Sequence, residues 1–214
     1  MSEIMRKRLP VFSARYTIGI ICEGDEEYDY IEKLKSLNVW NAQYRVMAFN
    51  ALGNGNIPAR YQDKYQNNVC DALFIFCDTD RKPYEQYEEI KAKINNFHGQ
   101  SDAAENVVIF GNPCTMQIIL MHWGQFNLPS HRKDKNAPLI EQCTGIKGYK
   151  AKEEQRRQLF SLINRDNYIR MKEYVAQLSQ DDRQKNSSNF IKLLNNLHCE
   201  DGRWIQEFNE KLEC

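Results

Sequence analysis

In the first 125 residues, short apolar runs alternate with stretches whose apolar positions recur at helical spacing. Continuous runs rich in β-branched and aromatic residues predict strands that are buried on both faces. Such runs occupy residues 16–22, 44–49, 72–77 and 107–110. Helical patterns follow the first three runs, and the third of these helices is expected to begin near Pro83. The alternation predicts an α/β fold with a central, mostly parallel sheet of about four strands.

Beyond Gly124 the pattern changes. Residues 125–150 are polar and are punctuated by Pro and Gly, which predicts a loop. Helical spacing returns in residues 151–180, again after Ser187-Ser188, which we expect to cap a helix, and again from Trp204. The sequence therefore predicts two parts: an α/β core over residues 1–125, and a loop and helical extension over residues 126–214 packed on that core.

Charge and composition exclude several classes of protein. Lys plus Arg and Asp plus Glu each total 29, so the formal net charge is zero, and a generally basic nucleic-acid coat is ruled out. No apolar run approaches the roughly 20 residues that span a bilayer, and the N-terminus lacks the apolar core of a signal peptide. The seven cysteines form no C-x-x-C pair and read as small buried residues. We expect a cytoplasmic protein without a membrane partner.

Acidic residues directly follow two of the predicted strands. Glu23 follows the first strand, and the pair Asp78 and Asp80 follows the third. The carboxyl ends of strands in an open α/β sheet face the ligand crevice, so these three carboxylates should converge if the two strands are neighbours. Crowded carboxylates repel one another, and a hard divalent cation, Mg²⁺ or Mn²⁺, removes that conflict. Glu27, one helical turn beyond Glu23, is a candidate to support this metal or to bind a second one.

Ordinary structural roles compete with this interpretation. Six acids and no base lie between Glu23 and Glu32, and acids at a helix N-terminus complement the helix dipole, which accounts for Asp25 or Glu26. A D-x-D sequence after a strand also occurs in turns. The presence of both motifs at strand ends of one chain favours a functional site.

These motifs resemble a known family. Glu23-Gly24-x-x-Glu27 with Asp78-x-Asp80 is similar to the Toprim domain, which topoisomerases, bacterial primases, small ribonucleases and the overcoming-lysogenization-defect (OLD) nucleases share. Gly111-Asn112-Pro113-Cys114, followed by an apolar helix and His122-Trp123, resembles a segment of RloB-like proteins, and so does Gly148-Tyr149-Lys150. RloB-like proteins are small Toprim proteins linked with phage defence and often paired with an ABC-type ATPase. The chain departs from the family at Thr115-Met116-Gln117, where Phe-Glu-Leu is usual, so an acid is missing there.

The resemblance implies a Toprim-like Rossmannoid core and a metal-dependent nuclease. It would hydrolyse phosphodiester bonds in DNA or RNA as an anti-phage effector of the abortive-infection type. Glu23 would act as general acid/base or as a metal-linked carboxylate, while Asp78 and Asp80 would bind Mg²⁺ or Mn²⁺. Asn112 is a further candidate site residue, because it belongs to the Gly111-Asn112-Pro113-Cys114 segment that resembles RloB-like proteins. Topoisomerase or primase activity is not expected, because the chain has no room for the further domains that these need.

A nuclease also needs cations near its metal. Residues 126–158 carry eight bases against four acids, a local charge of +4. Arg81 and Lys82 directly follow the D-x-D pair and are candidates to bind substrate phosphate, as is Lys150 through the family match. For residues 152–157 we expect a solvated helix surface rather than a phosphate-binding role. His122, in an apolar helix, reads as a core histidine.

Two other functions stay open at this stage. Haloacid-dehalogenase-like phosphatases also place D-x-D after a buried strand, but on the first strand of their fold and with Thr or Val where this chain has Lys82. A non-catalytic regulatory subunit of an ABC-type ATPase would use the metal site only to sense a state or to dock. The sequence leaves open whether the substrate is DNA, RNA or tRNA in particular, and whether the chain forms a homo-oligomer.

Overall fold

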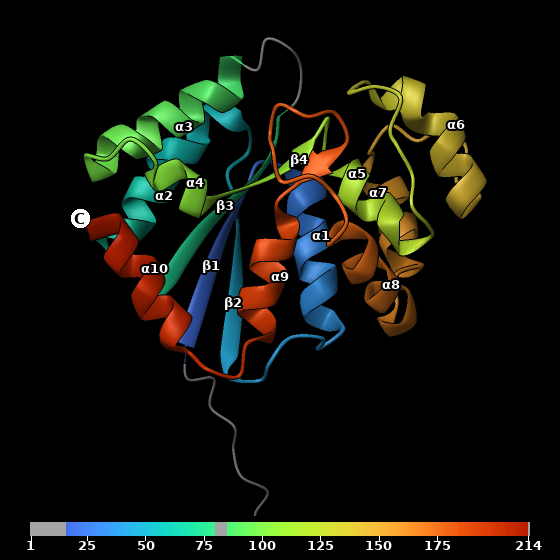
Figure 1. The fold of residues 1–214 in the computed structure, drawn as a ribbon. Coiled ribbons are helices and arrows are strands. Elements are labelled where there is room, and N and C mark those ends of the chain that lie inside the picture. Colours follow the sequence, from blue (N-terminus) through green and yellow to red (C-terminus); the bar gives the residue numbers. More distant parts are fainter. Residues whose placement is uncertain (1–15, 80–84, 214) are drawn as a thin grey trace, which may run out of the picture.

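A five-stranded sheet forms the centre of the protein (Figure 1). The computed structural model describes residues 16–79 and 85–213, and every structural statement below refers to these residues. The strand order is β2-β1-β3-β4-β5, in which β1 to β4 are parallel and β5 is antiparallel to β4. The strands are β1 (Tyr16–Cys22), β2 (Tyr44–Asn50), β3 (Ala72–Asp78), β4 (Val108–Asn112) and β5 (Ser187–Ser188).

Helices cover both faces of the sheet. One side carries α1 (Asp25–Ser36), α5 (Met116–Ile119), α7 (Glu153–Ser161), α8 (Arg165–Val175) and α9 (Phe190–His198). The other side carries α2 (Ile57–Gln66), α3 (Glu85–His98), α4 (Ala103–Val107) and α10 (Arg203–Glu213). Helix α6 (Lys133–Thr144) lies outside the first group, and two short 3₁₀ helices are η1 (Asn54–Asn56) and η2 (Leu120–His122). None of the helices described is both long and apolar enough to cross a membrane.

The prediction of a parallel α/β sheet is confirmed. The four predicted strands end within two residues of the observed ones, and every residue of β4 and all but the last of β3 are buried. A strand covered by helices on both faces needs apolar side chains at every position, which is why continuous apolar runs identified these strands.

The region after residue 125 differs from the prediction in three places. Residues 133–144, predicted as loop, form α6, whose interior Pro138 and polar composition hide the helical period. Ser187-Ser188 forms β5 rather than a helix cap, and Asn189 occupies the cap position of α9. The stretch 151–180 holds two helices instead of one, because Asn164 and Asn167 exchange hydrogen bonds of 3.0 and 2.8 Å that begin α8.

The C-terminal part completes the core rather than merely extending it. It supplies the edge strand β5, and of its helices α9 contacts β4 and α10 contacts β3. Both helices bury an apolar stripe, with Leu193 and Leu197 on α9 and Phe208 and Leu212 on α10.

The direction of the connections reverses between β1 and β3. β1 leads into α1 on one face of the sheet, whereas α3, the helix after β3, lies on the opposite face. In an open α/β sheet, ligands bind outside the carboxyl ends of strands at such a switch point. The two acidic motifs follow these two strands.

Candidate active site

The backbone brings Glu23 and Asp78 together at the switch point. β1 and β3 are paired neighbours with Cys22 opposite Phe76, and the pairing continues beyond β1 because the Glu23 amide donates to the Phe76 carbonyl at 3.0 Å. The Glu23 carboxylate then accepts a 2.9 Å hydrogen bond at Oε2 from the backbone N–H of Asp78. The Glu23 carboxylate thus reaches the backbone at the end of β3, while the convergence of the Glu23, Asp78 and Asp80 carboxylates on one metal stays a prediction, because Asp80 lies outside the described residues.

Thr115 fixes the Asp78 side chain. Oδ1 of Asp78 accepts two hydrogen bonds from Thr115, one from the backbone N–H at 2.6 Å and one from the hydroxyl at 2.7 Å. Both bonds use the same carboxylate oxygen, so Thr115 makes no use of Oδ2. Sequence reasoning missed Thr115, since the contact spans 37 residues and Thr115 is one of the departures from the RloB-like pattern.

Gly111 makes this contact sterically accessible. A Cβ added to Gly111 would lie 2.9 Å from the backbone carbon and oxygen of Cys114 and 3.0 Å from Cα of Thr115. Glycine at the end of β4 thus allows the turn before α5 to pack directly on the strand. Gly111 is paired with Asp78 across the sheet, which places Thr115 beside the carboxylate.

The electrostatic environment of Asp78 is unfavourable for a bare carboxylate. Burial raises the pKa of the Asp78 carboxyl well above its ordinary value, and the negative charges of Glu27 and Glu23 raise it further, against the lowering effect of the Thr115 hydrogen bond. Burial and the charges of Glu23 and Asp78 also raise the pKa of the neighbouring Cys77 thiol. The site therefore combines a desolvated carboxylate with neighbouring negative charges, and a divalent cation is suited to such a set of hard oxygen donors.

The first turn of α1 adds two buried acids. Glu27 accepts a 3.1 Å hydrogen bond at Oε2 from the backbone N–H of Gly24, which gives this residue a helix-capping role beside its electrostatic effect on Asp78. The Tyr149 hydroxyl donates a 2.6 Å bond to Oε1 of Glu26, and both residues are buried. In the Gly148-Tyr149-Lys150 motif it is therefore Tyr149 that reaches the acidic segment.

The basic residues of the segment 126–158 differ in their burial and in their partners. Arg156, expected on a solvated surface, is instead buried, and it bonds Asp29 at 2.7 Å, Asp25 at 3.3 Å and the Ala151 carbonyl at 2.7 Å. Arg132 and Arg157 form exposed ion pairs with acids of their own segments. Lys150 is exposed, and its backbone N–H donates to Gln155 at 2.8 Å.

Four other residues with polar or reactive side chains are buried within the fold. Asn112 is 2% exposed, and its amide donates to the carbonyls of Asp182 and Gln184 at 2.7 and 3.0 Å. His122 is fully buried between Tyr30 and Asn167, which confirms it as a core histidine. Cys22 and Cys77 are buried free thiols.

The described residues fit part of a metal site. Asp80, Arg81 and Lys82 lie outside the described residues, and within the described ranges no group of three His, Cys, Asp or Glu side chains is arranged to hold a metal. Thr79, next to Asp78, has a buried hydroxyl oxygen without a hydrogen-bond partner in the described part of the chain. The donor set of Asp78, Glu23 and Glu27 suits Mg²⁺ or Mn²⁺ in its chemistry.

Comparisons with known proteins add no relative. No family model, no curated protein and no solved structure matches this chain.

Proposed function

We propose that the chain is a Toprim-type, metal-dependent nuclease of the RloB-like kind that hydrolyses phosphodiester bonds in DNA or RNA. A role as an anti-phage effector, with an ABC-type ATPase as partner, comes with this proposal through the resemblance. The observation that carries it is the hydrogen bond from the Asp78 backbone N–H to the Glu23 carboxylate at the switch point of a mostly parallel sheet, where burial and the charges of Glu27 and Glu23 raise the pKa of the Asp78 carboxyl.

The acidic residues would hold the cofactor. Asp78 would bind Mg²⁺ or Mn²⁺, together with Asp80 by the D-x-D pattern, and Glu23 and Glu27 would support it. Such an ion, when bound, offsets charge on the scissile phosphate and lowers the pKa of an attacking water. Glu23 would hold or pass on the proton of the reaction, or share in binding the cation, while Thr115 keeps the Asp78 carboxylate in one orientation.

The position of the D-x-D strand argues against the phosphatase alternative. Asp78 is the last residue of β3, the third of the described strands along the chain, whereas haloacid-dehalogenase-like phosphatases carry the motif on the first strand of their fold. The negative charge of Glu23 beside Asp78 suits a site that binds a cation, and the cation in turn attracts a polyanionic substrate.

Cleavage assays test the proposal. The protein is incubated with plasmid DNA, single-stranded DNA and tRNA in Mg²⁺ or Mn²⁺, alongside Glu23→Gln, Asp78→Asn and the exposed control Asp166→Asn. We expect metal-dependent cleavage that both site variants lose and the control keeps. Absence of cleavage of every substrate, also with a partner ATPase present, would favour the regulatory alternative.

A further inference from the structure

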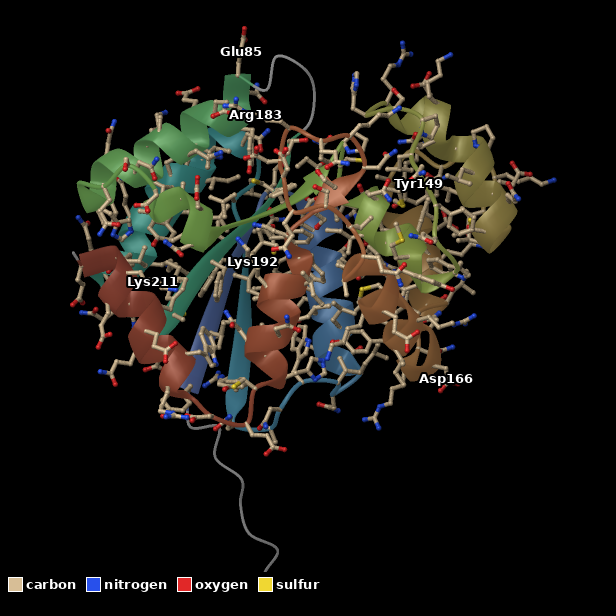
Figure 2. The ribbon with its side chains drawn as sticks, viewed as in Figure 1. Glu85, Tyr149, Asp166, Arg183, Lys192 and Lys211 are labelled. Atoms are coloured by element: carbon tan, nitrogen blue, oxygen red, sulfur yellow. The ribbon has the colours of Figure 1, made fainter. Side chains whose placement is uncertain are left out.

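The loop that precedes β5, residues 179–186, lies beside the candidate site. Ser188 of β5 pairs with Gly111, and Gly111 pairs with Asp78. Adjacent strands are about 4.8 Å apart, so the loop enters the sheet roughly 10 Å from Asp78. In Figure 2, Arg183 of this loop lies toward the same end of the molecule as Glu85, the first residue of α3 after β3.

The backbone of this loop is held firmly. The buried Asn112 amide binds the carbonyls of Asp182 and Gln184, and the Ser187 hydroxyl donates to the Gln184 carbonyl at 2.5 Å. The Asp182 carboxylate pairs with Lys91 at 2.7 Å and accepts from the Tyr87 hydroxyl at 3.1 Å. Asn112 thus acts on the loop and not directly on the acidic residues.

The loop presents two cations to solvent. The side chains of Arg183 and Lys185 are exposed, and the Lys185 ammonium makes a long 3.3 Å bond to the Pro129 carbonyl. Asp182 is paired with Lys91, Asp181 accepts from the Arg183 backbone N–H at 3.0 Å, and among the described residues neither acid forms an ion pair with Arg183 or Lys185. A backbone held in place beneath an exposed guanidinium and an exposed ammonium group suits phosphate recognition, since the loop loses little conformational entropy on binding.

We propose that Arg183 and Lys185 bind the sugar-phosphate backbone of a nucleic-acid strand and guide it to the acidic site at the ends of β1 and β3. The inference rests on the proposed function for the identity of the polyanion. It assigns Asn112 as a positioning residue, which holds the loop at the mouth of the site. Lys150, exposed after Tyr149 on the α1 side, would contact the strand beyond the acids.

Binding without turnover tests this assignment. The affinity of the full chain for fluorescein-labelled single-stranded DNA and for RNA of the same sequence is measured by anisotropy in EDTA, across a series of salt concentrations. Arg183→Ala/Lys185→Ala is compared with Arg170→Ala/Lys211→Ala, which removes the same charge from exposed positions on α8 and α10. We expect the loop variant to bind roughly tenfold more weakly. A plot of its log binding constant against log salt concentration should be shallower by about 1.4, because two phosphate contacts are lost.

Equal affinity and slope in the two double variants would overturn the proposal, and so would an absence of binding by the unmodified protein. Arg183→Lys/Lys185→Arg, which keeps the charges, is expected to retain binding. The proposed function is judged separately by Mg²⁺-dependent cleavage. A protein that binds through the loop but does not cleave would refute the nuclease and keep the loop assignment. Cleavage by the unmodified protein, with equally strong binding by the loop variant, would support the nuclease and refute the loop assignment.

Discussion

Thr115 donates two hydrogen bonds to a single oxygen of Asp78, so the carboxylate at the end of β3 is oriented by a residue that follows the neighbouring strand β4. The backbone N–H gives one bond and the hydroxyl the other. Oriented carboxylates are what a metal site needs, because partners behind a ligand fix its direction. The turn between β4 and α5 thereby becomes part of the candidate site.

Removing only the hydroxyl of Thr115 should weaken metal binding. Thr115→Val keeps the shape of the side chain and the backbone bond but loses one hydrogen bond to Asp78. Loss of such a supporting contact costs about 10-fold or more in metal affinity or activity, so we expect Mn²⁺ titrations followed by electron paramagnetic resonance to show about tenfold weaker binding. Thr115→Ser is the matched control and should retain the affinity. Equal affinities of Thr115→Val and the unmodified protein would show that Asp78 needs no such support.

Neutralising Asp78 should stabilise the metal-free protein. A carboxyl whose folded-state pKa is raised stabilises the fold at low pH, and this contribution is lost as the pH rises through the folded-state pKa. Asp78→Asn keeps an oxygen for the Thr115 bonds and removes the charge. In EDTA we therefore expect the variant to unfold at a higher temperature than the unmodified protein at pH 8, with a smaller difference at pH 4.

Added metal should reverse that order. At about 100 times its dissociation constant a ligand stabilises the folded state by about 2.7 kcal/mol, so Mg²⁺ or Mn²⁺ should raise the Tm of the unmodified protein and leave that of Asp78→Asn almost unchanged. Equal metal-induced shifts in both proteins would place the cation elsewhere.

The sequence predicted the parallel sheet because the strands are marked by local patterns, and it placed acids at the ends of the first and third strands. Buried parallel strands are continuous apolar runs, and acids after neighbouring strands share one edge of the sheet. Thr115 and Asn112 differ, because their partners lie 37 and 70 residues away along the chain. The sequence around these two residues does not indicate which distant group they contact. Helix α6 was missed for a local reason, since an interior proline resembles a loop signal.

His122 should make the stability of the fold depend on pH in the mildly acidic range. Its Nδ1 donates to Oδ1 of Asn167 at 3.1 Å, and its Nε2 accepts from the Tyr30 hydroxyl at 3.0 Å, an arrangement that fits the neutral ring. Burial lowers the pKa of His122 to about 4. Because the unfolded chain takes up the proton near the ordinary pKa of about 6.5, stability should be full above that pH and fall by about 3 kcal/mol as the pH drops toward 4.

Urea denaturation between pH 4 and pH 7.5 measures this dependence. His122→Gln, which retains a donor and an acceptor but cannot titrate in this range, should be less stable at pH 7.5 and show a shallower decline toward pH 4. His131→Gln, at an exposed position, is the control and should follow the unmodified protein. A decline of the same steepness in His122→Gln would assign it to other groups.

Asn189 should be essential to the edge of the sheet. β5 pairs only with Gly111 and Asn112, and beyond it the side chain of Asn189 takes the place of a strand: Oδ1 accepts from the Phe110 N–H and Nδ2 donates to the Val108 carbonyl, both at 2.8 Å. Asn189→Ala would leave these two buried backbone groups without partners. Each unsatisfied group costs about 1–3 kcal/mol, so the loss of both partners should lower the free energy of unfolding in urea by about 2–6 kcal/mol.

The exposed Asn195 on α9 provides the control. Asn195→Ala should change stability by less than about 0.5 kcal/mol, as surface substitutions usually do. An uncovered strand edge can also pair with another chain, so size-exclusion chromatography of Asn189→Ala should show additional association at high protein concentration. A variant as stable as Asn195→Ala would mean that water satisfies the edge of β4 as well as the asparagine does.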